Sequence, residues 1–216
     1  MTVYVYAITR NTSAPFECEG HRIDFVEAGD VAAAVERTRA APKLSEEALR
    51  TQHAIVMCIA ERVDEILPVR FGGFVDHLEL ERLITSRRES IQAALDLVRG
   101  RVQMTVRIRD SALAASRPEV TRPVAASTGT AYLEARRAAA VQPVPPAAAS
   151  VRDAVRHLVR AEHHDSDQRR GVASVYHLVE RGSVSEYQRI LSGIQPEAMT
   201  VTGPWPPFAF APDLWP

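Results

Sequence analysis

The sequence predicts an α+β protein built in two parts and closed by an extended tail. Short segments rich in β-branched and aromatic residues alternate with longer segments of helical periodicity, which is the pattern of mixed α and β structure. A chain of 216 residues has room for one large or two small domains. We place the boundary after Val75, between an N-terminal α+β domain of residues 1–75 and a C-terminal α+β domain of residues 76–216 with a helical arm and a tail.

The N-terminal domain is expected to be a small sheet with one helix. Its first strand is Thr2–Ile8, whose sequence TVYVYAI is typical of a buried strand. A helix should begin after Ser45, because this residue can cap the first turn and Glu46 and Glu47 follow it. The remaining expected strands are Ile23–Glu27, Val31–Thr38 and Ile66–Phe71.

A long helix is expected from Asp76 to Val98, with apolar residues at heptad-like spacing along one side. Two interpretations remain open, a coiled-coil arm or a core helix with a solvated back. As a seam, the stripe should face the second helix of the C-terminal domain. The stripe consists of Leu80, Leu83, Ile84, Ile91, Leu95 and Val98, and the facing residues are Val151, Val155, Leu158 and Val159.

The rest of the C-terminal domain alternates between strands and helices. The proline-rich segment 142–149 should separate its first two helices, because proline cannot continue helical hydrogen bonding. The expected elements are a strand at Val102–Ile108, a loop at Ser116–Ser127, a helix at Gly129–Ala140, a helix from Ser150 to Glu162, a strand at Val172–Val179, a helix at Ser183–Ile194 and a strand at Met199–Thr202.

Charge and hydropathy exclude several classes of protein. With 26 basic and 27 acidic residues, the chain lacks the basic excess of a general nucleic-acid binder. No apolar run approaches the roughly 20 residues of a membrane span. The alternation of Tyr4 and Tyr6 with valines at the start does not fit a signal peptide. We therefore expect a soluble, cytoplasmic protein that binds neither nucleic acid nor membrane.

The two cysteines, Cys18 and Cys58, lie far apart in the sequence and form no CxxC pair. This pattern is neither a disulfide framework nor a zinc knuckle. Cys58 falls on the expected helix with no suitably spaced histidine to activate it. We therefore expect a buried structural thiol rather than a nucleophile.

No motif indicates a catalytic residue, a cofactor or a metal ion. The best metal candidate is the group His157, His163, His164, Asp165 and Asp167, but helical zinc ligands lie one turn apart, and His157 would lie roughly 10 Å from the next histidine along a helix. A solvated helix end is the plainer interpretation. His53 lies beside an apolar stripe and is expected to be a core or border residue, and Thr128–Thr130 is explained by an ordinary N-cap.

The segment Gly203–Pro216 (GPWPPFAFAPDLWP) is dense in proline and aromatic residues. The prolines favour an extended backbone with little entropy to lose, and the aromatic side chains then need a surface to cover. The tail could dock on its own chain or on a partner. We favour docking on its own chain, with Gly203–Phe210 packed across both domains, because dense exposed aromatic patches are uncommon in monomers.

Four segments together suggest a family. They are VYVYAI at Val3–Ile8, LPVRFG at Leu67–Gly72 downstream of His53, GTAYL at Gly129–Leu133 and VTGPWPPF at Val201–Phe208. In this order they resemble the gas vesicle proteins GvpF and GvpL. The resemblance spans nearly the whole chain, and the LPVRFG and TGPWPPF motifs are the specific parts of it.

The resemblance implies a ferredoxin-like N-terminal domain and a C-terminal α+β domain with long coiled-coil-like helices. It further implies a minor, non-enzymatic component located at the gas vesicle, a cytoplasmic organelle. Its expected partners are the hydrophobic shell protein, bound during nucleation, and other gas vesicle accessory proteins. The candidate residues for partner binding or interdomain contact are Arg70, Phe71, Tyr132, Trp205, Phe208 and Phe210.

One alternative stays open at this stage. The chain could be a small-molecule-binding or enzymatic α+β domain on a ferredoxin-like scaffold, because fold does not determine function. A deep pocket around His53 and Arg70 would favour this alternative. For Arg70 itself, we expect a structural contact with a carboxylate or backbone carbonyls at the junction of the domains.

Overall fold

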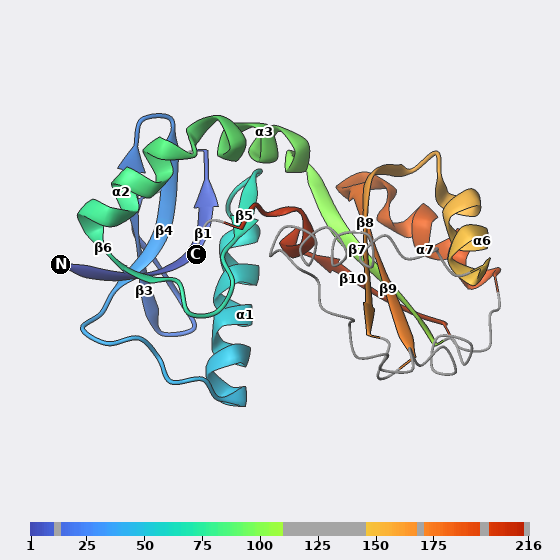
Figure 1. The fold of residues 1–216 in the computed structure, drawn as a ribbon, viewed down its shortest axis with the longest axis horizontal. Helices are drawn as coiled ribbons and strands as arrows, with labels where there is room; N and C mark the ends of the chain where they lie inside the picture. The colour runs from blue at the N-terminus through green and yellow to red at the C-terminus, as the bar shows by residue number, and fades with distance from the viewer. Residues whose placement is uncertain (11–13, 110–145, 168–170, 195–198, 214–216) are drawn as a thin grey trace, which may run out of the picture.

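The computed structural model describes residues 1–10, 14–109, 146–167, 171–194 and 199–213, which form two units side by side (Figure 1). The first unit is a six-stranded sheet with helices on both faces, and the second is a four-stranded sheet with two helices on one face. The predicted α+β class is confirmed. The first unit contains β1 (Thr2–Thr9), β2 (Phe16–Cys18), β3 (His21–Ala28), β4 (Val31–Arg37), α1 (Glu46–Ala60), β5 (Ile66–Pro68), β6 (Phe74–Asp76), α2 (His77–Ser86) and α3 (Arg88–Val98).

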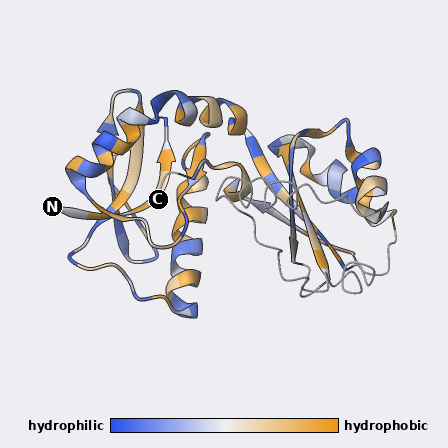
Figure 2. Ribbon diagram, in the orientation of Figure 1, coloured by the Kyte–Doolittle hydropathy of each residue, from blue (hydrophilic) through white to orange (hydrophobic). Residues whose placement is uncertain are grey.

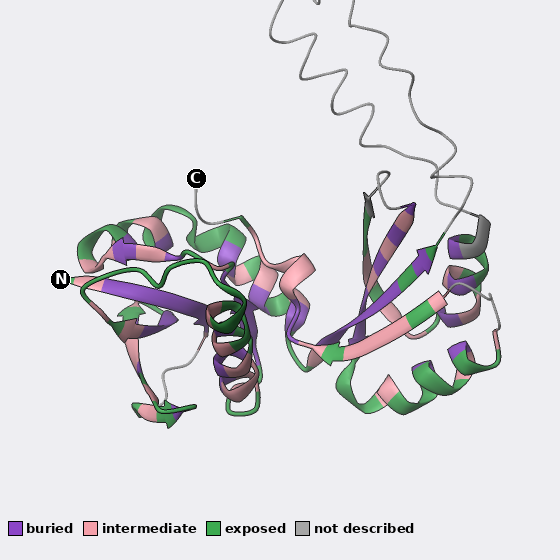
Figure 3. Cartoon of the chain, turned by 90° about the horizontal axis from the view of Figure 1, so that it is seen from below, coloured by how far each residue is buried: buried purple, intermediate pink, exposed green. Residues whose placement is uncertain are grey.

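Strand β1 is the centre of the first unit and is buried along almost its whole length (Figure 3). Its side chains alternate between two cores, with Val3 and Val5 in one and Tyr4 and Tyr6 in the other. This explains why its sequence is apolar throughout. The strand order is β2-β3-β4-β1-β5, and β6 pairs with the other part of β1.

Helix α1 covers one face of this sheet. Ser45 caps it as predicted, because its hydroxyl accepts a hydrogen bond from the N–H of Ala48 at 3.1 Å. Ile55, Val56 and Ile59 are fully buried against the sheet, whereas Leu49, nearer the start of the helix, is 45% exposed.

The expected long helix is two helices, α2 and α3, separated at Arg87, whose φ of −113° and ψ of 16° are not helical. Both alternate between hydrophilic and hydrophobic residues along their length (Figure 2). The buried stripe packs on the sheet face opposite α1, in one core with β1 and β4. The core-helix interpretation is therefore confirmed, and the predicted contact with the stripe of Val151 and Val155 is wrong, because those residues belong to another core.

This packing bears on two finer expectations from the sequence. A coiled-coil arm is not confirmed, since the stripe covers a sheet rather than a helix. A ferredoxin-like domain is not confirmed either, since the helices lie on opposite faces of the sheet. Helices α2 and α3 share a core with β1 and β4, and Leu178 of β9 belongs to the same core.

The second unit is an antiparallel sheet in the order β10-β7-β9-β8, with α6 and α7 on one face. Its elements are β7 (Arg101–Arg109), α6 (Pro146–Val155), β8 (Val159–Asp167), β9 (Val172–Glu180), α7 (Val184–Ser192), β10 (Met199–Trp205) and the short 3-10 helices η1 (Arg181–Ser183) and η2 (Phe208–Phe210).

The predicted helix from Ser150 to Glu162 is wrong at both ends. It begins at Pro146, inside the segment predicted to be a break, because proline is tolerated in the first turn of a helix, and it ends at Val155. Residues from Val159 onward form β8, because pairing with β9 overrides the local helical periodicity. Strands β7, β9 and β10 and helix α7 agree with the predicted positions to within a few residues. The loop predicted at Ser116–Ser127 and the helix predicted at Gly129–Ala140 lie outside the described residues.

A disulfide joins Cys18 of β2 to Cys58 of α1, with the Cα atoms 6.1 Å apart. The expectation of a buried free thiol is therefore wrong. The hairpin of β2 and β3 places Cys18 on the sheet face that α1 covers, and this is a tertiary proximity that spacing in the sequence does not reveal.

Loss of this disulfide should destabilise the chain. The link closes a loop of 40 residues, and restricting the unfolded chain over such a loop stabilises a protein by about 2–4 kcal/mol. Replacing Cys58 by serine should therefore lower the free energy of unfolding by this amount, measured by urea denaturation. A reductant should destabilise the wild-type chain to the same extent and leave the variant unaffected. A wild-type curve that does not move on reduction would contradict the prediction.

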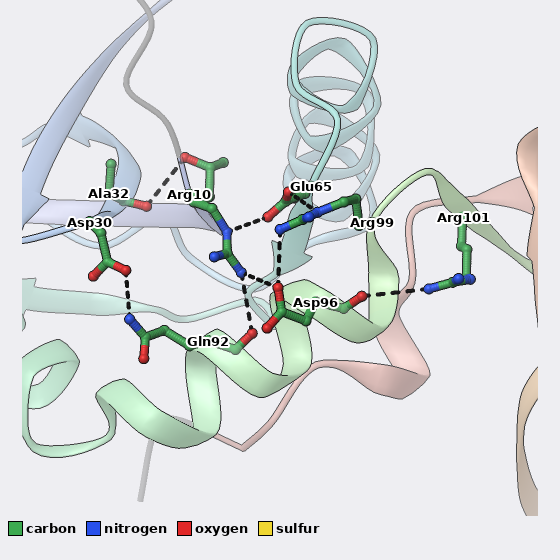
Figure 4. Close-up of polar contacts among 9 residues, drawn as sticks. Arg10, Asp30, Ala32, Glu65, Gln92, Asp96, Arg99 and Arg101 are labelled. Carbon is green, nitrogen blue, oxygen red and sulfur yellow. Dashed lines mark hydrogen bonds and ion pairs between the residues drawn. The ribbon is translucent and has the colours of Figure 1, made fainter.

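A network of arginines and carboxylates fastens α3 to the first sheet where the chain passes into the second unit (Figure 4). Glu65, whose side chain is 10% exposed, accepts hydrogen bonds from Arg10 at 2.7 Å and from Arg99 at 2.5 Å. The same two arginines pair with Asp96. Across the junction, Arg101 of β7 donates a hydrogen bond to the carbonyl of Leu97 on α3 at 2.7 Å and pairs with Glu180 of β9. The end of α3 is thus held on both sides.

Candidate partner-binding surface

The motif Leu67–Gly72 begins in β5 and continues into the turn that leads to β6. Its first three residues, Leu67–Val69, are buried, and the strand predicted to reach Phe71 ends at Pro68. β5 pairs with one part of β1 and β6 with another. Between them the chain bulges away, anchored by the N–H of Val69 on the carbonyl of Tyr6 (2.9 Å) and by the N–H of Val5 on the carbonyl of Gly73 (2.7 Å). As a result Arg70 is exposed and Phe71 is half-buried.

Glycine is needed at two positions of this loop, for a different reason at each. Gly72 has a φ of +101°, which disfavours a side chain, and its N–H donates to the hydroxyl of Tyr4 at 3.1 Å. At Gly73, a Cβ atom would lie 2.8 Å from the side chain of Val69 and 3.1 Å from the carbonyl of Val5. Close approach of the backbone therefore requires glycine here.

The change Gly73→Ala should destabilise the chain by about 1–3 kcal/mol, the usual cost of overpacking a buried position. Gly182→Ala is the matched control, because a Cβ there would meet nothing within 4 Å. Urea denaturation of both variants tests the prediction. If both lost the same free energy of unfolding, the close approach at Gly73 would be irrelevant to stability.

The tail begins in the second unit and ends on the first (Figure 1). Its strand β10 pairs with β7, and the register shifts between Thr202 and Trp205. Pro206 and Pro207 are then buried, and the N–H of Ala209 donates to the side-chain oxygen of Gln103 at 2.8 Å. The tail therefore lies across its own chain through Phe210.

The aromatic residues of the tail contact both cores of the first unit. Phe208 packs beside the core under α1, and Phe210 packs against the core under α2 and α3. The exposed ring of His53 on α1 lies 5.4 Å from the ring of Trp205 and 6.5 Å from that of Phe208. Arg87 then donates a hydrogen bond to the carbonyl of Asp213.

The loop and the tail enclose a cavity of about 240 Å³. Arg70, Phe71 and Phe208 line it together with Asp213. Within the described part of the chain, no ion pair joins Arg70 to Asp213 or to any other carboxylate. The guanidinium of Arg70 is thus available at the mouth of a half-apolar cavity.

The sequence candidates fall into three groups. Arg70, Phe71 and Phe208 line one cavity, while Trp205 and Phe210 lie before and after Phe208 along the same tail. Tyr132 lies outside the described residues. Among the described residues that line the cavity of Arg70, His53 is not present, so this cavity is not the pocket around both residues that would favour the alternative function.

The described residues contain no cluster of three or more histidine, cysteine, aspartate or glutamate side chains placed to hold a metal ion. Of the group considered in the sequence, His163, His164 and Asp165 lie on strand β8, whereas His157 lies in the turn before it. Among the helices that the structure describes, none is long and apolar enough to cross a membrane.

A polar cluster in the second unit was not found from the sequence. Its centre is Glu162, which accepts hydrogen bonds from Arg152, lies within hydrogen-bond distance of His164, and lies 2.9 Å from Nε2 of His177. Nδ1 of His177 lies 2.7 Å from the hydroxyl of Tyr187. His177 and Tyr187 are fully buried, whereas Arg152, His164 and Glu162 keep part of their surface exposed.

The protonation of this cluster follows from its surroundings. Burial lowers the pKa of His177, against the opposing effect of Glu162. For Glu162, burial raises the pKa, but the hydrogen bonds from Arg152, His164 and His177 outweigh it and lower the pKa to about 2. A neutral His177 beside an ionised Glu162 must donate from Nε2 and accept the proton of Tyr187 at Nδ1. Burial also raises the pKa of Tyr187.

The two sheets, the loop between β5 and β6 and the docked aromatic tail are thus parts of one α+β architecture. The sequence matches the family described as gas vesicle synthesis protein GvpL/GvpF over residues 2–212. The chain therefore belongs to the GvpL/GvpF family, and the resemblance noted in the sequence is confirmed.

Solved structures show the same fold. The crystal structure of gas vesicle protein GvpF from Microcystis aeruginosa superposes with a TM-score of 0.71 at 15% identity, covering 98% of this chain and 99% of that one. That of GvpF from Anabaena sp. PCC7120 gives a TM-score of 0.69 at 13% identity, covering 98% of both chains. No curated protein sequence matches.

Proposed function

We propose that this chain is a non-enzymatic accessory protein of gas vesicle assembly that binds the hydrophobic shell protein during nucleation. The observation that carries this proposal is the family match over residues 2–212. A shell subunit built to face gas exposes a large apolar surface before assembly and would aggregate without cover. A factor that binds this subunit until it joins the shell would act at the gas vesicle, in the cytoplasm, together with other accessory proteins.

The surface that we assign to this contact consists of the loop Pro68–Gly73 and the tail segment Phe208–Asp213. It combines an exposed guanidinium with the half-buried rings of Phe71 and Phe208 around one cavity. Arginine and aromatic side chains are the types that contribute most to protein interfaces. Because the loop is anchored on β1 and the tail on β7, both would bind with little loss of conformational entropy.

A pull-down with matched arginine variants tests this assignment. The shell protein, kept soluble by fusion to a carrier protein, is immobilised and mixed with the wild type, Arg70→Ala or Arg82→Ala. Arg70 and Arg82 are both exposed on the first unit, and neither forms an ion pair among the described residues. Arg70→Ala should weaken retention about tenfold or more, and Arg82→Ala should not.

Thermal melting of the three proteins separates binding from folding. Equal melting temperatures with reduced retention of Arg70→Ala support a contact residue. A lower melting temperature with unchanged retention would instead assign Arg70 a structural role at the junction. Absence of retention for the wild type would contradict shell-protein binding itself.

A further inference from the structure

A second cavity, of about 450 Å³, lies on the other side of Phe71, between α1 and the sheet. The loop from Thr38 to Ser45 passes along its edge. The side chains that line it include those of Tyr4, Tyr6, His21, Glu36, Gln52 and Phe71. Phe71 lines both cavities, but the other residues of this one are not part of the surface assigned to the shell protein.

Aromatic rings form one wall of the cavity. The ring centroids of Tyr4 and Tyr6 lie 5.1 Å apart, and those of Tyr4 and Phe71 lie 6.2 Å apart. The hydroxyl of Tyr4 is fixed between the side-chain oxygen of Gln52 at 2.5 Å and the N–H of Gly72 at 3.1 Å. Clustered aromatic rings held in this way are suited to contact with a cation.

A carboxylate whose partners within the described residues include a histidine but no arginine or lysine lies beside these rings. Glu36, 28% exposed, accepts a hydrogen bond from the hydroxyl of Tyr6 at 2.7 Å and lies 3.1 Å from Nδ1 of His21. No lysine or arginine of the described chain forms an ion pair with it. Lys43 lines the rim but is not paired with Glu36.

Three other carboxylates with little exposed surface each have an arginine as a partner. Asp24, Glu65 and Glu162 are each paired with at least one arginine. Taking a carboxylate out of water is costly unless an opposite charge compensates for it. Among the described residues Glu36 therefore has only a histidine and a tyrosine hydroxyl as partners in place of an arginine, and it faces a cavity large enough for a side chain from outside.

An exposed apolar residue lies next to the lining of the cavity along the chain. Leu44 lies between two lining residues, Lys43 and Ser45, and is 75% exposed. An exposed leucine beside a charged cavity suits a protein segment in which a basic residue has an apolar neighbour.

We propose that this cavity binds the arginine or lysine side chain of a partner protein, with the cation beside Glu36 and the aromatic rings and an apolar neighbour on Leu44. The same cation could also come from a free amine or amino acid, and the test separates these sources. The proposal is independent of shell-protein binding through Arg70 and holds for any partner with such a segment.

The test is a titration of the full-length, isotopically labelled chain followed by NMR. The probes are the blocked peptide acetyl-Leu-Arg-Leu-amide, the same peptide with glutamate in place of arginine, and acetyl-arginine-amide. We expect saturable shifts of amides around the cavity with the arginine peptide, none with the glutamate peptide, and weaker binding of acetyl-arginine-amide. Absence of saturable shifts, or equal binding of both peptides, would overturn the proposal.

Two variants locate the site. Glu36→Gln should weaken the arginine peptide about tenfold or more, whereas Glu27→Gln, an exposed carboxylate on β3 outside the cavity, should not. Leu44→Ser, at an exposed position where folding is not at risk, should weaken the peptide but not acetyl-arginine-amide. Unchanged binding by Glu36→Gln would refute the site. Equal affinity of peptide and acetyl-arginine-amide would refute a partner protein as the source.

Discussion

Leu95→Ala should lower the free energy of unfolding by about 2–5 kcal/mol, the range for truncating a fully buried leucine. Leu95 lies on α3 with none of its surface exposed, in the core that α2 and α3 share with β1 and β4. Because that core joins both helices to the central strand, a cavity there weakens the whole first unit. Urea denaturation followed by circular dichroism measures the loss.

Leu78→Ala is the control on the preceding helix. Leu78 is 60% exposed, and a surface change of this kind stays within about 0.5 kcal/mol. If Leu95→Ala cost as little as Leu78→Ala, the apolar stripe would be exposed in solution and free to bind a partner, as a coiled-coil arm would be.

Glu162→Ala should cost about 3 kcal/mol, at the lower end of the range for breaking a buried ion pair. The change leaves the fully buried His177 without its acceptor, while Arg152, whose side chain is 42% exposed, can return to water. Glu162→Gln keeps one acceptor and should cost less. If both variants lost the same free energy of unfolding, the acceptor that glutamine retains would contribute nothing to stability, which would contradict the prediction.

The same cluster predicts a loss of stability in acid. His177 and Glu162 both have a lower pKa in the folded chain than in the unfolded chain, so the unfolded chain binds more protons as the pH falls. The contribution of His177 is complete above about pH 6.5 and is lost below it. That of Glu162 is complete above its unfolded pKa of 4.5 and is lost as the pH falls toward 2.

Melting temperatures between pH 8 and 4 test the histidine part. The wild type should lose stability below pH 6.5, and His177→Gln should show a flatter dependence. His157→Gln, which removes an exposed histidine, should follow the wild type. A His177→Gln curve parallel to that of the wild type would contradict the prediction.

Local patterns predicted most of the elements. The double burial of β1 is visible in TVYVYAI, and the start of α1 is visible in Ser45 with the glutamates that follow it. What the sequence could not show was which surfaces meet. The apolar stripe of α2 and α3 is equally compatible with a helix or a sheet as its partner, and only the tertiary structure placed it on β1 and β4.

Only part of the candidate site could be predicted, again because the sequence does not show which elements meet. Motif residues such as Arg70, Phe71 and Phe208 are recognisable in the sequence, and they line one cavity. The Glu162 cluster and the disulfide join residues from different elements, so no spacing rule reveals them. A histidine at the fully buried position 177 of a predicted strand was the one available signal, because a buried histidine needs hydrogen-bond partners.

We propose that gas vesicles need this chain in order to assemble. The most direct measurement is the pressure-collapsible turbidity of cells that carry a complete set of gas vesicle genes with or without the gene for this chain. Without it, we predict that the shell protein is still made but is recovered in aggregates, and that collapsible turbidity is lost and returns with the wild-type gene. Gas vesicles of normal number and shape in cells that lack the chain would contradict the account.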